Sequence, residues 1–357
     1  MIGIRTDANN IIATGHMMRC ITIADALIRC GNSVVFYIAD SNSRILLDSK
    51  VGHNAKNEIV QLNTVWDDME SELPLLIKHL QSRKVTTLLV DSYKVTHRYF
   101  ETLNNICKTA YIDDLFYDVY PLDILINYSA YVDIFDYESA YKSMYGFEHK
   151  PTKLLLGLKY APLREQFYHA ENTDIIEVKD HFNILLASGG GDRYGMLSAI
   201  LSEALHSDFW DDNITWHVIV GDYSDDKVIE SLASTYGNIS VHKSVEKMAS
   251  LMRSCDLAIV AAGTMLTECA AVKLPAVFYQ MADNQKYGVQ YWGAPGRMIF
   301  AGNAIEDKNG TISNIIREAG SLINTPGRLE SIKECIADIT DGRGAIRIAK
   351  ELMEIDI

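Results

Sequence analysis

The stretch that decides the fold is Arg5-Thr6-Asp7-Ala8-Asn9-Asn10-Ile11-Ile12-Ala13-Thr14-Gly15-His16-Met17-Met18-Arg19-Cys20. It leads from a short apolar strand, expected at residues 2–5, through a polar loop into an amphipathic helix over residues 15–30. His16 stands where this helix begins, and the first turn of a helix presents unpaired N–H groups and a partial positive charge that attract phosphate. An imidazole at this place can act as an acid or a base beside a phosphorylated substrate. The simpler alternative is that His16 only begins the helix.

The same alternation of strands and helices continues through the first half of the chain. Apolar runs predict strands at 2–5, 34–38, 87–90, 110–112 and 122–126, and amphipathic patterns predict helices at 15–30, 66–82 and 96–107. Buried strands that alternate with helices indicate a parallel sheet covered on both faces. From residue 127 the pattern loosens, apart from a short strand at 154–156, and we place the end of the first domain at residue 160.

The alternation restarts in the second half. Strands are expected at 183–187, 216–220, 239–241, 257–260 and 276–279, with helices near 193–206, 225–236, 245–254, 264–273, 311–323, 326–337 and 342–354. The sequence therefore predicts an α/β protein of two doubly wound, Rossmann-like parallel-sheet domains, at 1–160 and 161–357, with the last helix able to pack back on the N-terminal domain. Ligands of this architecture bind at the carboxyl ends of the strands, here in a cleft between the domains.

Overall composition excludes several classes of partner. The 357 residues are 48% hydrophobic and 22% charged, with a net charge of −14. Nucleic acids and anionic membranes attract basic surfaces, so we expect neither a nucleic-acid partner nor stable membrane association. No basic segment precedes an apolar core at the N-terminus, and no apolar run reaches about 18 residues, so we expect a cytoplasmic protein.

The spacing of cysteines and histidines gives no support for a metal site. The six cysteines form no CxxC pair, and the ten histidines include no HxxxH or HExxH arrangement. The cysteines are instead typical of small core residues in a reducing compartment. We expect no metal and no other cofactor, although a Mg²⁺ ion carried by a diphosphate is compatible with the sequence.

Two glycine-bearing loops follow strands of the second half. In Ser188-Gly189-Gly190-Gly191-Asp192 the glycines allow a phosphate or another backbone to approach closely, although a tight turn explains them equally well. In the other loop, Gly263 and Thr264 open a helix whose next turn carries Glu268. The amides of Gly263 and Thr264 can cradle a diphosphate while Glu268 accepts hydrogen bonds from ribose hydroxyls. Alternatively, Thr264 and Glu268 only cap the helix.

A third polar loop, Gln280-Met281-Ala282-Asp283-Asn284-Gln285, follows the next strand. Asn284 and Gln285 offer both donors and acceptors, which suit sugar hydroxyls or an amide. Asp283 is a candidate N-cap of the helix that follows.

Carboxylates end two strands of the first half. Val90-Asp91-Ser92-Tyr93 and Tyr111-Ile112-Asp113-Asp114 bring acidic side chains to the same edge of the sheet as His16. A carboxylate beside an imidazole orients it and raises its basicity, and the phenol of Tyr93 can position a substrate or water. For at least one of Asp113 and Asp114 we favour turn formation.

Taken together, these segments resemble the UDP-sugar hydrolases of pseudaminic acid biosynthesis, which have the glycosyltransferase-B architecture and are related to the MurG glycosyltransferase. The resemblance spans nearly the whole chain, through segments at 5–7, 15–20, 90–93, 112–115, 189–192, 256–259, 263–264 and 282–285. The order and joint spacing of these segments are more specific than any one of them. The form of the loop at 263–268 is closer to that of the MurG-like transferases.

The resemblance implies hydrolysis of UDP-2,4-diacetamido-2,4,6-trideoxy-β-L-altropyranose to UDP and the free sugar, by attack of water at the anomeric carbon with inversion and without a metal. It implies that His16 is the general base and that Tyr93 lies near the sugar. By the same resemblance Glu268 would hold the ribose, Gly263 with Thr264 the diphosphate, and the backbone near Met248 the uracil.

The resemblance also fixes the full set of expected site residues. Asp7 joins His16 and Tyr93 in the catalytic set, and the UDP-sugar-binding set is Gly15, Arg19, Gly189, Gly190, Met248, Gly263, Thr264, Met265, Glu268, Asn284 and Gln285. The expected partners of this monomer are a UDP-sugar substrate and the product UDP. Two other functions stay open: a UDP-sugar-dependent glycosyltransferase of the MurG-like type, in which His16 deprotonates an acceptor hydroxyl, and a sugar-nucleotide binding protein without turnover.

Overall fold

The chain divides into two compact α/β units. A computed structural model describes residues 1–9, 15–50, 57–145, 151–168, 181–189, 191–192, 194–207, 211–221 and 227–354. The first unit comprises Met1–Arg164 and Arg343–Ile357, and the second comprises Glu165–Gly342. The C-terminal segment of the chain thus belongs to the same unit as its N-terminus.

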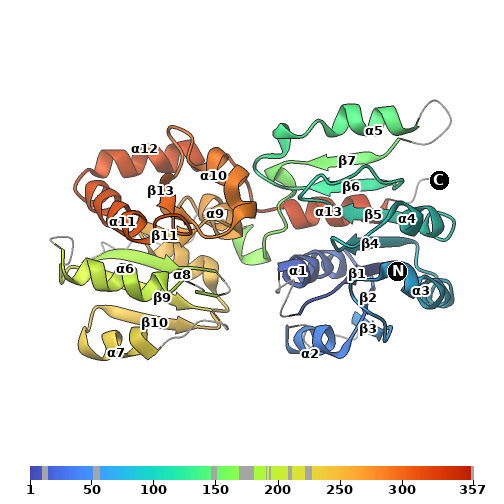
Figure 1. The fold of residues 1–357 in the computed structure, drawn as a ribbon, viewed down its shortest axis with the longest axis horizontal. Helices are drawn as coiled ribbons and strands as arrows, with labels where there is room; N and C mark the ends of the chain where they lie inside the picture. The colour runs from blue at the N-terminus through green and yellow to red at the C-terminus, as the bar shows by residue number, and fades with distance from the viewer. Residues whose placement is uncertain are drawn as a thin grey trace. The chain divides into compact units, whose positions relative to one another are not determined.

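In its described residues the first unit contains a sheet of seven parallel strands, in the order β3-β2-β1-β4-β5-β6-β7 (Figure 1). The strands are β1 (Ile2–Thr6), β2 (Val34–Ile38), β3 (Asn57–Gln61), β4 (Thr87–Asp91), β5 (Lys108–Ile112), β6 (Ile124–Asn127) and β7 (Lys153–Leu156). The helices are α1 (Gly15–Arg29), α2 (Ser41–Lys50), α3 (Met69–Arg83), α4 (His97–Leu103), α5 (Tyr137–Tyr145) and α13 (Gly344–Met353), with 3₁₀ turns η1 (Val132–Ile134) and η2 (Leu158–Tyr160).

Alternating side chains of these strands build a core on each face of the sheet. On β2, Phe36 packs into one core, whereas its neighbours Val35 and Tyr37 pack into the other. Helices α1 and α13 cover the first face and contact each other, while α3 and α4 cover the second. The strands are buried on both faces because successive side chains of a strand point to opposite sides.

The second unit repeats this architecture with six parallel strands in its described residues, in the order β10-β9-β8-β11-β12-β13 (Figure 1). These strands are β8 (Phe182–Ala187), β9 (Ile214–Val220), β10 (Ile239–Lys243), β11 (Leu257–Ala261), β12 (Ala276–Gln280) and β13 (Ile299–Asn303). The helices are α6 (Met196–Leu205), α7 (Lys227–Thr235), α8 (Met248–Ser254), α9 (Thr264–Ala271), α10 (Lys286–Trp292), α11 (Lys308–Ile323) and α12 (Pro326–Ile336), with 3₁₀ turns η3 (Glu165–Phe167) and η4 (Asp283–Gln285).

The predicted fold class, two doubly wound parallel sheets, is confirmed, but several elements differ from the sequence prediction. Two strands, β3 and β13, and two α-helices, α2 and α5, have no counterpart in that prediction. The helix expected from residue 66 begins at Met69, because Asp68 accepts a hydrogen bond from the Ser71 amide and caps it. The helix expected over residues 96–107 is α4 and ends at Leu103.

The order of strands in the first sheet reverses beside β1, which lies between β2 and β4. In open parallel sheets the loops at such a switch point diverge and leave room for a ligand at the carboxyl ends of the strands. The loop from β1 to α1 and the loop from β4 to α4 therefore define where a site is expected. None of the described helices is long and apolar enough to cross a lipid bilayer.

Candidate active site

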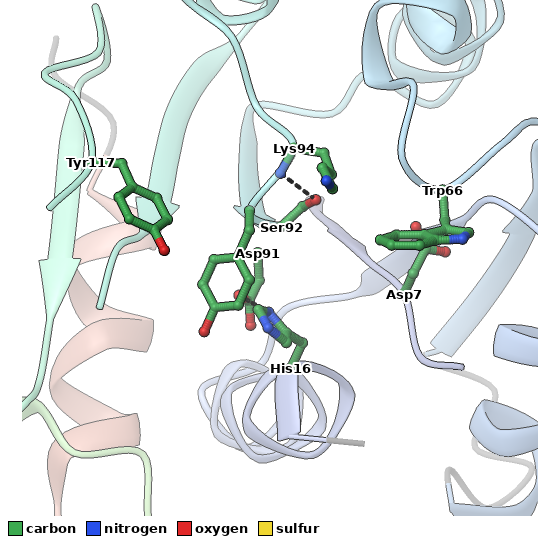
Figure 2. A pocket seen from close by; sticks show the side chains of 8 residues that line it. Asp7, His16, Trp66, Asp91, Ser92, Lys94 and Tyr117 are labelled. Atoms are coloured by element: carbon green, nitrogen blue, oxygen red, sulfur yellow. Dashed lines mark hydrogen bonds and ion pairs between the residues drawn. The ribbon is translucent and has the colours of Figure 1, made fainter. Parts of the chain in front are cut away.

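A cavity of about 330 Å³ opens at this switch point of the first sheet. Eight residues line it: Asp7, His16, Trp66, Asp91, Ser92, Tyr93, Lys94 and Tyr117 (Figure 2). His16 lies in the first turn of α1, Asp91 ends β4, and the others lie in the loops that follow β1, β3, β4 and β5, so the parallel topology gathers them at one edge of the sheet. This volume is in the range of pockets that hold small molecules.

His16 and Asp91 form the centre of this cavity. His16 is the second residue of α1, and Asp91 is the last residue of β4, the strand that pairs with β1. The two side chains point toward each other in Figure 2, and the Nδ1 atom of His16 lies 2.5 Å from Oδ1 of Asp91. With Nδ1–H donated to the carboxylate, the lone pair of the neutral ring lies on Nε2. No described residue forms a hydrogen bond with Nε2, which suits it to accept a proton from a bound molecule.

Arg19 completes the environment of Asp91. The guanidinium of Arg19 donates two hydrogen bonds to the carboxylate of Asp91, from Nε to Oδ2 at 2.6 Å and from Nη2 to Oδ1 at 2.5 Å. Burial alone would raise the pKa of Asp91, but the neighbouring Arg19 and His16 outweigh burial and hold that pKa well below its ordinary value. Asp91 is therefore a carboxylate throughout the neutral range, and it fixes the orientation of the imidazole.

Tyr93 borders the imidazole from the loop that follows β4. Its ring meets the His16 ring edge to face, with centroids 4.6 Å apart and an interplanar angle of 82°. The Tyr93 hydroxyl donates to Oδ2 of Asp114 at 3.2 Å, and the same oxygen accepts from Nη1 of Arg19 at 2.8 Å. Burial and the Asp114 carboxylate raise the pKa of Tyr93 well above its ordinary value. The phenol thus stays protonated, and its oxygen can accept a hydrogen bond from a ligand.

The two acids at the end of β5 have separate roles. Asp113 accepts hydrogen bonds from the backbone amides of Leu115 and Phe116, so it forms the turn that the sequence favours for one of this pair. Asp114 instead joins Arg19 and Tyr93. The sequence alone left both roles open.

Asp7 lines the cavity but is held by its own neighbours. Its Oδ2 atom accepts from Arg5 at 2.5 Å, and its Oδ1 atom accepts from the Ala39 amide at 2.7 Å and from the Ser43 hydroxyl at 3.1 Å. Burial raises the pKa of Asp7, and Arg5 opposes this rise. These contacts tie the end of β1 to the end of β2 and to α2, so Asp7 shapes the cavity wall. Gly15, the first residue of α1, is exposed beside His16.

Gly15 and Arg19 of the expected UDP-sugar-binding set lie on α1 in the first unit, where Arg19 is paired with Asp91 and Asp114. The other members of the set lie in the second unit, where neighbouring strands bring their loops to one sheet edge. Gly189 follows β8, Gly263 follows β11 and Asn284 follows β12, and these three strands are adjacent and parallel. Gly189 has a φ of +84°, a conformation that favours glycine. The predicted site residue Gly190 lies outside the described residues.

Helix α9 begins with its first backbone amides uncapped by the side chain of its N-cap residue. Gly263 is its N-cap in extended conformation, and this glycine provides no side-chain capping hydrogen bond. Gly263 and Thr264 are exposed, while Met265 and Glu268 are partly exposed. The alternative that Thr264 and Glu268 only cap this helix stays open. An uncapped helix start of this kind suits an anion.

Two of the other expected contacts are occupied by groups of the protein itself. Ala249, beside Met248, donates its amide to Oε1 of Gln166 at 2.8 Å, and Nε2 of Gln166 donates to the Glu246 carbonyl at 2.9 Å. Met248 itself is buried. The Oε1 atom of Gln285 accepts from the amides of Met281 and Ala282, which fixes the loop after β12. Among the described residues the Gln285 amide nitrogen has no hydrogen-bond partner.

Trp66, Lys94 and Tyr117 line the cavity but were missed by the sequence reasoning. Each lies in a loop outside the motifs, and Trp66 falls in a segment that the periodicity assigns to a helix. Because Asp68 caps α3 and the helix begins at Met69, Trp66 lies in the preceding loop, and its indole can reach the cavity. Asp68 is a residue type that often caps the start of a helix. Giving this signal more weight than the hydrophobic periodicity would have predicted a loop at Trp66.

The described residues contain no group of three or more histidine, cysteine, aspartate or glutamate side chains placed to hold a metal ion. The acidic side chains around His16 are instead paired with arginine or turned toward backbone amides. The chemistry available in the cavity is that of an oriented imidazole, a protonated phenol and an ammonium group.

Comparison with known proteins supports the fold. A model of the lipid-A-disaccharide synthetase family matches residues 161–284. An uncharacterized protein of Methanocaldococcus jannaschii is 24% identical over 300 residues, which cover 80% of this chain and 56% of that protein. The chain thus spans little more than half the length of this relative.

Solved structures resemble the whole chain. The Acinetobacter baumannii MurG structure has a TM-score of 0.65 at 12% identity, with 99% of both chains covered. The UDP-GlcNAc 2-epimerase of Neisseria meningitidis, solved with bound UDP-GlcNAc, has a TM-score of 0.59 at 13% identity, also with 99% of both chains covered. At such identities the likeness is one of fold, and the chain has the glycosyltransferase-B architecture expected from its sequence.

Proposed function

We propose that this protein hydrolyses a UDP-linked 2,4-diacetamido-2,4,6-trideoxy sugar at the anomeric carbon, giving UDP and the free sugar for nonulosonic (pseudaminic) acid biosynthesis. The observation that carries the proposal is the His16–Asp91 pair in a cavity, with Nε2 of His16 unpaired among the described residues. Structural neighbours that act on UDP-sugars, such as the epimerase with bound UDP-GlcNAc, support the substrate class.

In the proposed reaction His16 is the general base. A water molecule transfers a proton to Nε2 while its oxygen bonds to the anomeric carbon, and the bond from that carbon to the β-phosphate oxygen breaks with its electron pair leaving on UDP. Attack from the face opposite the leaving group inverts the anomeric configuration. The Asp91 carboxylate stabilises the imidazolium that forms, as a buried orienting carboxylate does in other His-dependent hydrolases.

The proposal assigns binding of UDP to the second unit. The uncapped start of α9 would receive the diphosphate, with Glu268 on the ribose. UDP is a good leaving group when its charge is dispersed by backbone amides, so a metal is not required for departure. The uracil is assigned to the backbone near Met248, where it would compete with Gln166 for the Ala249 amide.

Isotope labelling distinguishes this function from its alternatives. Purified protein is incubated with the UDP-sugar in ¹⁸O-water, and UDP release and the position of the label are measured. We expect UDP without any acceptor, and label in the sugar. Release of UDP only after an acceptor is added would indicate a glycosyltransferase, and label in phosphate would indicate cleavage of the diphosphate. Binding without turnover would indicate a sugar-nucleotide binding protein.

The base is tested by His16→Gln, which we expect to lower kcat by about 10²–10⁴-fold. The matched control is His97→Gln. His97 also pairs with a carboxylate, Asp118 at 3.1 Å, but both side chains are about half exposed and neither lines the cavity. The His97 variant should keep the activity of the unmodified protein. Equal activity of the two variants would contradict the assignment of His16.

A further inference from the structure

Lys94 and Trp66 meet on one wall of the His16 cavity. Lys94 lies in the loop between β4 and α4, and Trp66 lies in the loop between β3 and α3. The Nζ atom of Lys94 is 5.9 Å from the centre of the indole ring, within reach of a weak cation–π interaction. Figure 2 shows the two side chains together on one side of the cavity, with Tyr117 on the other.

The ammonium group of Lys94 lacks a carboxylate partner among the described residues. The cavity has two acids in its wall, Asp7 and Asp91, and arginines hold both. The backbone amide of Lys94 donates to the Ser92 hydroxyl at 3.1 Å, which fixes the loop from which the side chain extends. Lys94 therefore brings a hydrogen-bond donor to the cavity that no described carboxylate neutralises.

Trp66 places an apolar surface beside this donor. The residue is partly buried, and its indole ring forms part of the cavity wall. An ammonium group next to an indole face matches a ligand group that has a hydrogen-bond acceptor and an apolar end close together. An N-acyl group has both, since its carbonyl oxygen accepts and its methyl group is apolar. A hydroxyl lacks the methyl, and a protonated amine would be repelled by Lys94.

We propose that Lys94 and Trp66 form a subsite for an N-acyl substituent of the substrate sugar, with the carbonyl oxygen on Nζ of Lys94 and the methyl group on the indole of Trp66. The inference rests on the proposed function for the identity of the sugar nucleotide. Through Lys94 and Trp66, the first unit would select acylated amino sugars over the parent hydroxyl sugars.

Kinetic selectivity tests the subsite. The ratio of kcat/KM for a UDP-N-acetylamino sugar to kcat/KM for the matching UDP-hydroxyl sugar is measured in Lys94→Met and Trp66→Leu. We expect each ratio to fall by about tenfold, because a hydrogen bond to a charged group or a buried methyl contact is lost and the hydroxyl sugar makes neither contact. Unchanged ratios in both variants would overturn the proposal.

The control is Lys159→Met. Lys159 also lies over an aromatic ring, with Nζ 5.1 Å from the centre of Tyr160 in the same unit, but it does not line the cavity. The selectivity of this variant should equal that of the unmodified protein. A similar loss in Lys159→Met would show that the effect does not come from the cavity.

A binding measurement separates failure of the subsite from failure of the hydrolase proposal. Saturation-transfer NMR with the methyl glycosides of an N-acetylhexosamine and of the parent hexose requires no turnover. We expect preferential saturation of the acetyl methyl group, lost in Trp66→Leu and Lys94→Met and kept in Lys159→Met. Weak, uniform saturation of the sugar in all proteins would overturn the subsite, even if UDP-sugars are hydrolysed.

Discussion

At the scale of single residues, Asp91 connects the groups on which the proposed chemistry depends. It is 1% exposed, and it accepts from His16 and from two nitrogens of Arg19. Arg19 in turn reaches Asp114, which holds the Tyr93 hydroxyl. The base and the phenol are therefore positioned by one buried network, in which removing a charge leaves its partner uncompensated.

Asp91→Asn should lower kcat by about 10²–10⁴-fold, because the amide no longer stabilises an imidazolium or fixes Nδ1–H. It should also lower the free energy of unfolding by about 3–5 kcal/mol, since it breaks a buried ion pair. Steady-state kinetics and chemical denaturation measure the two effects. The control is Asp118→Asn, which alters an exposed pair and should change stability by less than about 1 kcal/mol. Comparable effects of the two substitutions would contradict a special role for Asp91.

The lowered pKa of Asp91 also predicts how stability depends on pH. Its folded-state pKa lies below the unfolded value of about 3.9, so the folded state gains stability that is fully present above about pH 4 and is lost as the pH falls through the folded pKa. Denaturation at a series of acidic pH values should show a shallower loss of stability in Asp91→Asn than in the unmodified protein. Parallel curves would exclude this contribution.

The site residues that could be predicted from the sequence lie at the ends of strands and helices, and those that could not be predicted lie inside loops. His16 and Asp91 end or begin regular elements, so strand order brings them to one sheet edge before any side chain is placed. Trp66, Lys94 and Tyr117 lie inside loops, where no periodicity fixes the direction of a side chain. The identity of their neighbours depends on loop conformation, which the sequence pattern does not encode.

At the scale of elements, periodicity located the central strands well and missed two strands at sheet edges. The strand expected at 34–38 is β2, buried at every position. β3 and β13 are edge strands, each paired on one side only. In β3, with the sequence Asn-Glu-Ile-Val-Gln, only Val60 is buried, so the apolar run that marks a central strand is absent.

Helix α9 allows a prediction about the nucleotide. If Glu268 accepts hydrogen bonds from the ribose, Glu268→Ala should weaken binding of UDP by about tenfold and bring it close to the affinity for 2′-deoxy-UDP. Isothermal titration calorimetry with the two nucleotides measures this loss of discrimination. The control is Glu334→Ala on the exposed surface of α12, which should leave both affinities unchanged. If Glu268→Ala keeps its preference for UDP, the ribose is bound elsewhere.

At the scale of the whole molecule, the chain returns at its end to the unit in which it began. Helix α13 contacts α1, and its residues Ala345, Ile348 and Leu352 join the core on that face of the first sheet (red in Figure 1). The Thr87 hydroxyl on β4 donates to the Leu352 carbonyl at 3.0 Å. Because α1 carries His16, the helix that supports the base is itself supported by residues more than three hundred positions later.

The first residue of α13 packs tightly against the backbone of the first unit. Gly344, its first residue, is buried, and a Cβ at this position would overlap the backbone of Tyr160 and Ala161. Gly344→Ala should therefore displace α13 and lower the free energy of unfolding by about 1–3 kcal/mol. Gly327 offers a matched control, because it lies in the first turn of α12 and a Cβ there would meet open space. Gly327→Ala should be neutral or stabilising by up to about 1 kcal/mol.

Hydrogen exchange followed by mass spectrometry resolves the effect by segment, which a single unfolding transition of a two-unit chain does not. In Gly344→Ala we expect faster exchange in peptides from α13 and α1, with peptides from the second unit unchanged. Gly327→Ala should leave α1 and α13 as protected as in the unmodified protein. If α13 exchanges faster while α1 does not, the C-terminal helix does not stabilise the helix that carries His16, and activity should survive the substitution. Joint loss of protection should instead be accompanied by a lower kcat.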